Sequence, residues 1–169
     1  MRLVFNSTPL IYLAKVGLLP LLEKLPPERF TTAGVKREVV DRGKEKAAKD
    51  ALIIEETIQR GVLKIGKITD KGFLRMLSKI PELHSTDAEV LTFAREIKGI
   101  AVVDDKVARE IAKIYGITHG GTVFILFLLI ARGLITKAAA RAALEEMIHL
   151  GWRCYAEQYS QIIRMIEAG

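Results

Sequence analysis

The segment Ile100-Ala101-Val102-Val103 constrains the fold most strongly, because it is apolar at four consecutive positions and ends directly at two aspartates. Runs of this kind are typical of parallel sheets covered by helices on both faces. Leu3-Val4-Phe5 is a similar run, and Arg29-Phe30-Thr31 and Val62-Leu63-Lys64-Ile65 are further candidate strands. Helical patterns separate these runs along the chain. The alternation predicts an α/β fold, in which ligands bind at the carboxyl ends of the strands.

Start and stop signals predict the helices between these strands. We expect a helix that begins at Thr8, a helix over Leu18 to Lys24, a helix that opens at Thr32 and ends at Gly43, and one over 45–60. One short helix is expected within 67–84. A capping box of Thr86 and Glu89 predicts a helix to about Lys98. The remaining helices are predicted at about 106–115, 123–131, 136–149 and 155–167, with 116–118 as a short strand or loop.

Length, charge and cysteine content restrict the class of protein. A chain of 169 residues fits one domain, 1–169, in which helices 136–167 are packed core or else a lid or dimer surface. The net charge of +6 is compatible with RNA, DNA or an acidic protein as a partner, or with solubility alone. Cys154 is the single cysteine, which fits a reducing, cytoplasmic setting. The apolar run Val123 to Ala131 is far below the ~20 residues that cross a bilayer, so we expect a fully buried helix and no membrane segment.

Acidic side chains fall where predicted strands end or helices begin. Asn6 follows the first strand, Asp104 and Asp105 follow the strand 100–103, Asp87 lies at a helix start, and Glu38 lies one turn into a helix. One edge of a parallel sheet can gather all of them. Carboxylates brought together repel one another, and Mg²⁺ or Mn²⁺ relieves this repulsion, because hard cations prefer oxygen ligands. Such a metal activates water and stabilises the leaving group of a phosphodiester.

Every one of these acids also has a purely structural explanation. Asp87 gains from the helix dipole, and Glu38 can be a solvated surface residue. Asp104 can cap the helix after the strand, and Asp105 adds a second acid where one cap would suffice. Nearby cationic side chains are candidates for holding phosphates or are ordinary surface residues: Lys15, Arg37, Arg42, Lys106 and Arg109. The three histidines lack zinc-site spacing, and Gly120-Gly121-Thr122 is not a complete phosphate-binding loop.

Taken in order, several segments resemble the acidic motifs of PIN domains, and nearest to them a prokaryotic branch related to the VapC-type toxins. The resemblance is carried by Val4-Phe5-Asn6-Ser7-Thr8-Pro9-Leu10-Ile11, Val35-Lys36-Arg37-Glu38-Val39, Thr86-Asp87-Ala88-Glu89, Val102-Val103-Asp104-Asp105-Lys106, Gly120-Gly121-Thr122 and Arg132-Gly133-Leu134-Ile135. It implies a three-layer α/β/α fold with a mostly parallel sheet and RNA cleavage that depends on Mg²⁺ or Mn²⁺. It also implies frequent homodimers and often a small antitoxin protein as partner.

Carried over by position, Glu38 and Asp87 match the second and third acidic motifs. Asp105 is the lead match for the fourth, and Asp104 is its rival. The first family acid is replaced by Asn6, whose neutral carbonyl oxygen is a weaker metal ligand than a carboxylate. Ser7 or Thr8 would orient a water or a phosphate, and Arg37, Lys106 and Arg109 would contact the substrate.

Three functional hypotheses follow. The first is a metal-dependent endoribonuclease whose catalytic acids are Glu38, Asp87, Asp104 and Asp105, with Asn6 completing the metal ligands. The second, motivated by Asn6, is a PIN-like module that binds nucleic acid or protein with weak or no catalysis. The third is a doubly wound α/β protein of another class, which would be favoured if Asn6 and Asp105 lay on opposite edges of the sheet.

Overall fold

A computed structural model describes all residues 1–169, and its centre is a five-stranded, wholly parallel sheet. The strand order is β3-β2-β1-β4-β5, with bounds β1 (Arg2–Phe5), β2 (Glu28–Thr32), β3 (Lys64–Gly66), β4 (Ile100–Val102) and β5 (His119–Gly120). In register, Leu3 lies beside Arg29 of β2 and Ile100 of β4. After β1 the chain thus adds β2 and β3 on one side of it, and then crosses over to place β4 and β5 on the other side.

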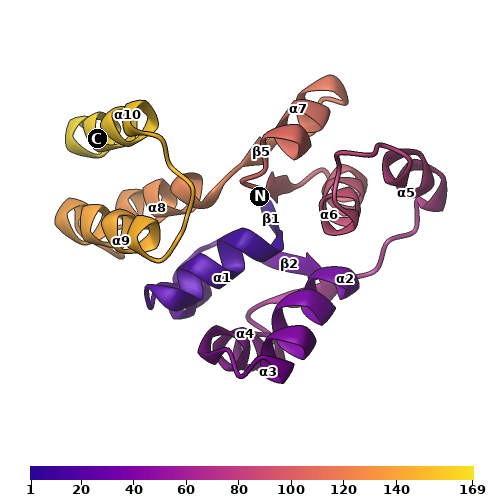
Figure 1. The fold of residues 1–169 in the computed structure, drawn as a ribbon, viewed down its shortest axis with the longest axis horizontal. Helices are drawn as coiled ribbons and strands as arrows, with labels where there is room; N and C mark the ends of the chain where they lie inside the picture. The colour runs from indigo at the N-terminus through magenta and orange to yellow at the C-terminus, as the bar shows by residue number, and fades with distance from the viewer.

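Helices cover both faces of the sheet (Figure 1), which confirms the predicted three-layer α/β/α architecture. On one face, α6 contacts β1, β2 and β4 and lies between α5 and α7. On the other, α1 contacts α4 and α8. The helices are α1 (Ser7–Lys15), the 3₁₀ helix η1 (Leu19–Lys24), α2 (Ala33–Lys36), the π-helical turn η2 (Arg37–Asp41), α3 (Arg42–Glu45), α4 (Lys49–Gln59), α5 (Lys71–Ser78), α6 (Ser85–Glu96), α7 (Lys106–Ile114), α8 (Thr122–Ala131), α9 (Lys137–His149) and α10 (Ala156–Ala168). No helix is long and apolar enough to span a membrane.

The two central strands are buried on both faces, as their composition predicted. Leu3, Val4 and Phe5 of β1 are fully buried, and so are Ala101 and Val102 of β4. Removing these side chains from water supplies much of the driving force for folding, at roughly 1.5–3 kcal/mol for each large apolar side chain. The core therefore fixes the positions of the two strand ends that matter for the site.

The prediction that the apolar helix 123–131 is fully buried is wrong in part. Ile125, Leu126 and Leu129 of α8 are fully buried, whereas Val123, Phe124 and Phe127 are half-buried. An apolar helix is buried all round only when neighbours cover every face. One face of α8 is left partly open, and its aromatic side chains remain accessible.

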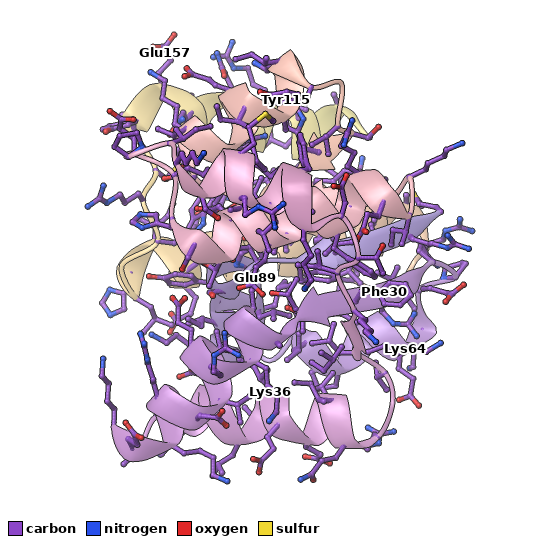
Figure 2. The ribbon with its side chains drawn as sticks, turned by 90° about the vertical axis from the view of Figure 1, so that its right-hand side faces the viewer. Phe30, Lys36, Lys64, Glu89, Tyr115 and Glu157 are labelled. Atoms are coloured by element: carbon purple, nitrogen blue, oxygen red, sulfur yellow. The ribbon has the colours of Figure 1, made fainter.

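Two predicted helix starts are corrected by the structure. The first helix begins at Ser7 after Asn6, so Thr8 lies inside the first turn. The helix predicted to begin at Thr86 begins at Ser85, and Glu89 does not close a capping box. Instead Glu89 accepts a hydrogen bond from the backbone N–H of Gly34 at 3.2 Å, across the gap to α2 (Figure 2). A Cβ atom at Gly34 would meet that carboxylate, so a larger residue there would displace the side chain of Glu89.

Gly43 does not end a helix, contrary to the prediction. The helix that starts with α2 continues through η2 and α3 to Glu45, and the next helix begins at Lys49 instead of 45. A Cβ atom at Gly43 would lie 2.8 Å from the Cβ of Ala51. The glycine therefore permits close packing of α3 on α4, and a helix-stop signal was the wrong interpretation.

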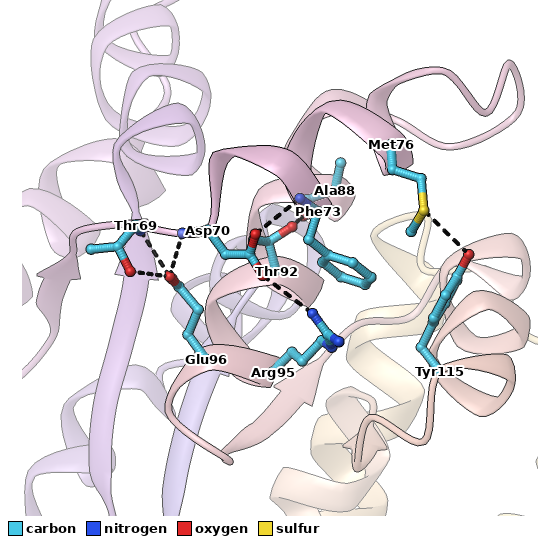
Figure 3. A network of polar contacts seen from close by, with 9 residues as sticks. All are labelled: Thr69, Asp70, Phe73, Met76, Ala88, Thr92, Arg95, Glu96 and Tyr115. Carbon is cyan, nitrogen blue, oxygen red and sulfur yellow. Dashed lines mark hydrogen bonds and ion pairs between the residues drawn. The ribbon is translucent and has the colours of Figure 1, made fainter.

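Smaller shifts affect the edge elements. The strand predicted at 62–65 lies at 64–66, and the short strand or loop expected at 116–118 is followed by β5 at 119–120. The expected short helix within 67–84 is α5. Glu96 of α6 accepts hydrogen bonds from the N–H groups of Thr69 and Asp70, and Arg95 pairs with Asp70 at 3.2 Å (Figure 3). Polar contacts thus fasten the start of α5 to the end of α6.

Candidate functional site

The ends of β1 and β4 lie side by side although they are almost a hundred residues apart in the sequence. The backbone N–H of Asn6 donates to the carbonyl oxygen of Val102 at 3.0 Å. Because the strand order reverses at this pair, a crevice opens at their carboxyl ends, where α/β proteins commonly bind ligands. Asn6 and Asp105 therefore lie on the same edge of the sheet, which argues against the third hypothesis.

A cleft of about 1050 Å³ occupies this edge. It is lined by every residue that the sequence proposed as a metal ligand: Asn6, Glu38, Asp87, Asp104 and Asp105. Asp87 is 2% exposed, Asp104 and Asp105 are half-buried, and Glu38 is exposed. The structure thus brings all five side chains to one cavity, and their role as ligands stays a prediction.

Asn6 is tied to Asp87 by its side chain. Its amide nitrogen donates to Oδ1 of Asp87. Its carbonyl oxygen Oδ1 is buried and has no hydrogen-bond partner, and neither has the buried hydroxyl of the neighbouring Ser7. Buried polar atoms without a partner are costly, so they are uncommon in folded proteins. Asn6 and Ser7 both line the cleft, so a donor or a cation bound there could supply the missing partner, whereas the third such oxygen, Oε2 of Glu96, lies outside the cleft.

Asp87 has an unusual acidity. Burial, reinforced by the negative charges of Asp105, Glu38 and Asp104, raises the pKa of Asp87 from 3.8 to about 7, although His84 opposes the shift. No lysine or arginine forms an ion pair with Asp87. A carboxylate among like charges favours the protonated state until something positive approaches. Strongly perturbed acids inside clefts are frequent at functional sites.

Asp104 has a different set of partners. It accepts hydrogen bonds from the N–H of Thr122 at 2.7 Å, from the hydroxyl of Thr122 at 2.6 Å, and from the indole N–H of Trp152 at 3.1 Å. A Cβ at Gly121 would lie 2.5 Å from Oδ1 of Asp104, so a larger residue there would displace this carboxylate from its hydrogen bonds. These contacts make Asp104 a junction between the end of β4, the start of α8 and the loop before α10.

Asp105 caps the following helix. Its Oδ2 accepts a hydrogen bond from the N–H of Ala108 at 3.0 Å, at the first turn of α7. The sequence suggested Asp104 as the cap and Asp105 as an additional acid, and the structure corrects this, because the capping contact belongs to Asp105. Because a carboxylate has about four acceptor positions, capping leaves Asp105 with capacity for a further ligand.

The donor set suits a hard divalent cation. As the side chains stand, no three histidine, cysteine, aspartate or glutamate side chains lie close enough together to hold a metal ion. However, Asn6, Asp87, Asp105 and Glu38 line one cavity, and their side-chain oxygens are the kind of ligand that Mg²⁺ and Mn²⁺ prefer. A cation would also remove the repulsion that raises the pKa of Asp87.

The predicted substrate contacts divide into two groups. Ser7, Thr8 and Arg109 line the cleft, whereas Arg37 and Lys106 are exposed and do not. Helical geometry explains the position of Arg37, because it directly precedes Glu38 and neighbouring helix positions point about 100° apart. Lys106 lies three residues before Arg109, on the same side of α7, and only Arg109 lines the cleft. The cleft also contains the cationic side chains of Arg42 and Arg153.

The sequence did not point to the wall formed by the C-terminal part of the chain. Trp152 and one face of α10, including Gln161, Ile162 and Met165, also line the cleft. The single tryptophan directly after Gly151 was a usable signal. Its partner Asp104, however, is 48 residues away, and no local pattern connects the two.

The fold and the site define an α/β protein with an acidic cleft at the switch point of a parallel sheet. A family model described as a PIN domain matches residues 2–168, so the chain belongs to the PIN-domain family, whose fold is of the nuclease type. The family match decides against an α/β protein of another class. No curated protein matches the sequence.

Proposed function

We propose that this protein is a metal-dependent endoribonuclease of the VapC-like type, which hydrolyses RNA phosphodiesters with Mg²⁺ or Mn²⁺. The observation that carries the proposal is Asp87, a buried carboxylate that faces three other acids with no lysine or arginine partner. Burying an ionised carboxylate near other acids lowers the stability of the fold, and a cation bound between them would offset this loss.

Each polar residue of the cleft has a proposed role. Asp87, Asp105 and Glu38 would hold the cation, and the carbonyl oxygen of Asn6 would complete its ligands. When bound, the cation would activate water for attack and stabilise the negative charge of the phosphodiester. Asp104, whose oxygens already accept three hydrogen bonds, would contribute mainly by fixing the end of β4. Arg109 would hold a flanking phosphate and Ser7 or Thr8 would orient a phosphate or water.

The direct test is the Asp87→Asn variant in a cleavage assay with Mn²⁺ and a single-stranded RNA. We expect cleavage to be abolished, because the amide keeps the size of the side chain and removes its charge. Asp41→Asn is the matched control, since Asp41 is an exposed acid one turn from Glu38 and does not line the cleft. Unchanged turnover in Asp87→Asn would exclude this residue as an essential ligand.

A second candidate function, binding of nucleic acid or protein without catalysis, is favoured by Asn6. Its side-chain amide donates a hydrogen bond to Oδ1 of Asp87, and so takes up a carboxylate oxygen that a cation would otherwise bind. The Asn6→Asp variant separates the two candidates when it is assayed with Mn²⁺ beside the parent. Cleavage by the parent supports the nuclease, whereas cleavage gained only in the variant supports a binding module that has lost catalysis.

The larger assembly is also a proposal. We infer that residues 1–169 act as one domain in the cytoplasm, pair as a homodimer and meet a small antitoxin protein. The support is the resemblance to VapC-type toxins together with the family match. Light scattering of the purified chain gives the oligomeric state directly, and a monomer at micromolar concentration would contradict the dimer.

A further inference from the structure

The cleft has a second, apolar side that the carboxylate chemistry does not use. We call it the apolar wall, and it consists of Phe124, Phe127, Trp152, Ile162 and Met165. Its members come from α8, from the loop after α9 and from α10, which Figure 1 shows on the opposite side of the molecule from α6. Met165 is 56% exposed, and the two phenylalanines are half-buried. These side chains therefore present accessible apolar surface inside a cavity that is otherwise polar.

The geometry of α10 makes this wall continuous. Gln158, Gln161, Ile162 and Met165 are spaced by three or four residues, so they share one face of the helix. Trp152 joins this face to the acids, because its indole N–H donates to Asp104 at 3.1 Å. The apolar wall thus begins at Asp104, the residue before the proposed ligand Asp105, and continues along α10.

We propose that the apolar wall is a nucleobase subsite, which holds one unstacked base of a single-stranded RNA next to the phosphate that is cleaved. The proposal rests on the proposed function, since it places the base beside that phosphate. A phosphate gains nothing from phenylalanine and methionine side chains. A base does, because each base has an apolar π-face that stacks on aromatic side chains.

Size and polar groups fit a base together with its backbone. A cleft of about 1050 Å³ exceeds what one phosphate and a cation fill, and it reaches the upper range of pockets for small ligands. Gln161 stands at the wall with an exposed amide, which can donate to and accept from a base edge. Arg153 follows Trp152 in the same loop and lines the cleft, where it can contact the next phosphate.

The same reasoning selects single-stranded RNA over a duplex. In an A-form duplex the faces of the bases are stacked on one another and are not available to side chains. A base reaches the apolar wall only after leaving such a stack. Loops and single strands offer unstacked bases without that cost, so they are the expected substrates.

The test is a binding measurement that does not require cleavage. A fluorescein-labelled single-stranded RNA octamer is titrated with the full chain in EDTA, and a series of octamers carries one abasic nucleotide at each successive position. We expect a single position at which loss of the base weakens binding about tenfold, within the range of one base–aromatic stack. 2-Aminopurine at that position should lose fluorescence on binding, because stacking quenches it.

Variants link the effect to the apolar wall. Phe127→Leu keeps the apolar volume of the side chain and removes the aromatic face, so the effect of the abasic position should shrink several-fold. Phe30→Leu is the control, because Phe30 is also half-buried but lies on β2 outside the cleft. Met165→Ala, at an exposed position, provides a second variant should Phe127→Leu fold poorly.

The outcomes separate this inference from the proposed function. The subsite would be overturned, and the nuclease would stand, if the protein cleaves RNA with Mn²⁺ but its affinity is the same for every position of the abasic nucleotide. Duplex RNA that binds as tightly as single-stranded RNA would have the same meaning. A sharp abasic effect without cleavage would support the subsite while contradicting the nuclease. A flat series in a protein whose apolar wall is protected by a co-purified polypeptide would overturn the subsite in favour of a protein partner.

Discussion

Two clusters of acids in this molecule are built in opposite ways. The first lies at the junction of α5 and α6, where Glu96 accepts hydrogen bonds from the N–H groups of Thr69 and Asp70. The carboxylate of Asp70 forms an ion pair with Arg95 and caps α5 by accepting a hydrogen bond from the N–H of Phe73. In the second, in the cleft, Asp87 is buried among acids, and its single hydrogen-bond donor is the neutral amide of Asn6.

The difference separates acids whose ionised form stabilises the folded state from acids whose ionised form destabilises it. A carboxylate with backbone N–H donors and an arginine gains from being ionised. A buried carboxylate facing other carboxylates loses by being ionised, which is what the raised pKa of Asp87 expresses. Both Asp70 and Asp87 lie at the start of a helix, so their position in the sequence does not distinguish them.

The largest expected effect is on the pH dependence of stability at Asp87. The pKa of Asp87 is about 7 in the folded chain, against the ordinary value of 3.8 that applies to the unfolded chain. Between these two pH values the folded protein therefore holds a proton that the unfolded chain has released. Stability must therefore fall as pH rises from about 4 to 7. In Asp87→Asn this loss is absent, and the difference in unfolding free energy between variant and parent should grow by roughly 2–4 kcal/mol from pH 4 to pH 8.

Urea denaturation of both proteins at pH 4, 6 and 8 measures this difference. Comparing the change across pH removes any constant effect of the substitution itself. A difference that stays level over the window would show that Asp87 is not destabilised in the folded chain, and the comparison of the two clusters would fail.

The opposite sign is expected in the first cluster. Glu96→Ala removes the acceptor of the N–H groups of Thr69 and Asp70 and should lower the free energy of unfolding by about 1–2 kcal/mol, with water replacing part of the loss. Glu110→Ala, at an exposed position of α7, serves as control and should change stability little. If the Glu96 variant is as stable as the parent, the first cluster does not contribute to the free energy of unfolding.

The smallest effect on stability should come from Trp152→Phe. This variant tests whether Asp104 is stabilised by its hydrogen-bond donors, like the acids of the first cluster, or is destabilised, like Asp87. Asp104 lies in the cleft but is surrounded by donors, like the acids of the first cluster. Loss of the indole N–H should cost about 1 kcal/mol, because Thr122 still donates two hydrogen bonds. Thermal unfolding measures the change, and a gain in stability would place Asp104 with Asp87 instead.

Much of the fold could be predicted from the sequence, because the information was local. Two-sided burial of β1 and β4 followed from Leu3-Val4-Phe5 and Ile100-Ala101-Val102, and the parallel α/β architecture followed from their alternation with helices. Gly43 misled because its reason is tertiary: it permits the packing of α3 on Ala51 of α4. A sequence shows that a glycine is present and not which neighbour requires it.

The sequence by itself determined the parallel sheet, the order of the acidic motifs and the neutral Asn6 among them, since these depend on residue type and spacing along the chain. Only the tertiary structure decided which partners each acid has: Asn6 for Asp87, the helix α7 for Asp105, and Thr122 with Trp152 for Asp104. It also placed the apolar wall beside the acids. The physical reason is that charge interactions and packing depend on distances in space, and chain crossovers bring together residues that no local pattern relates.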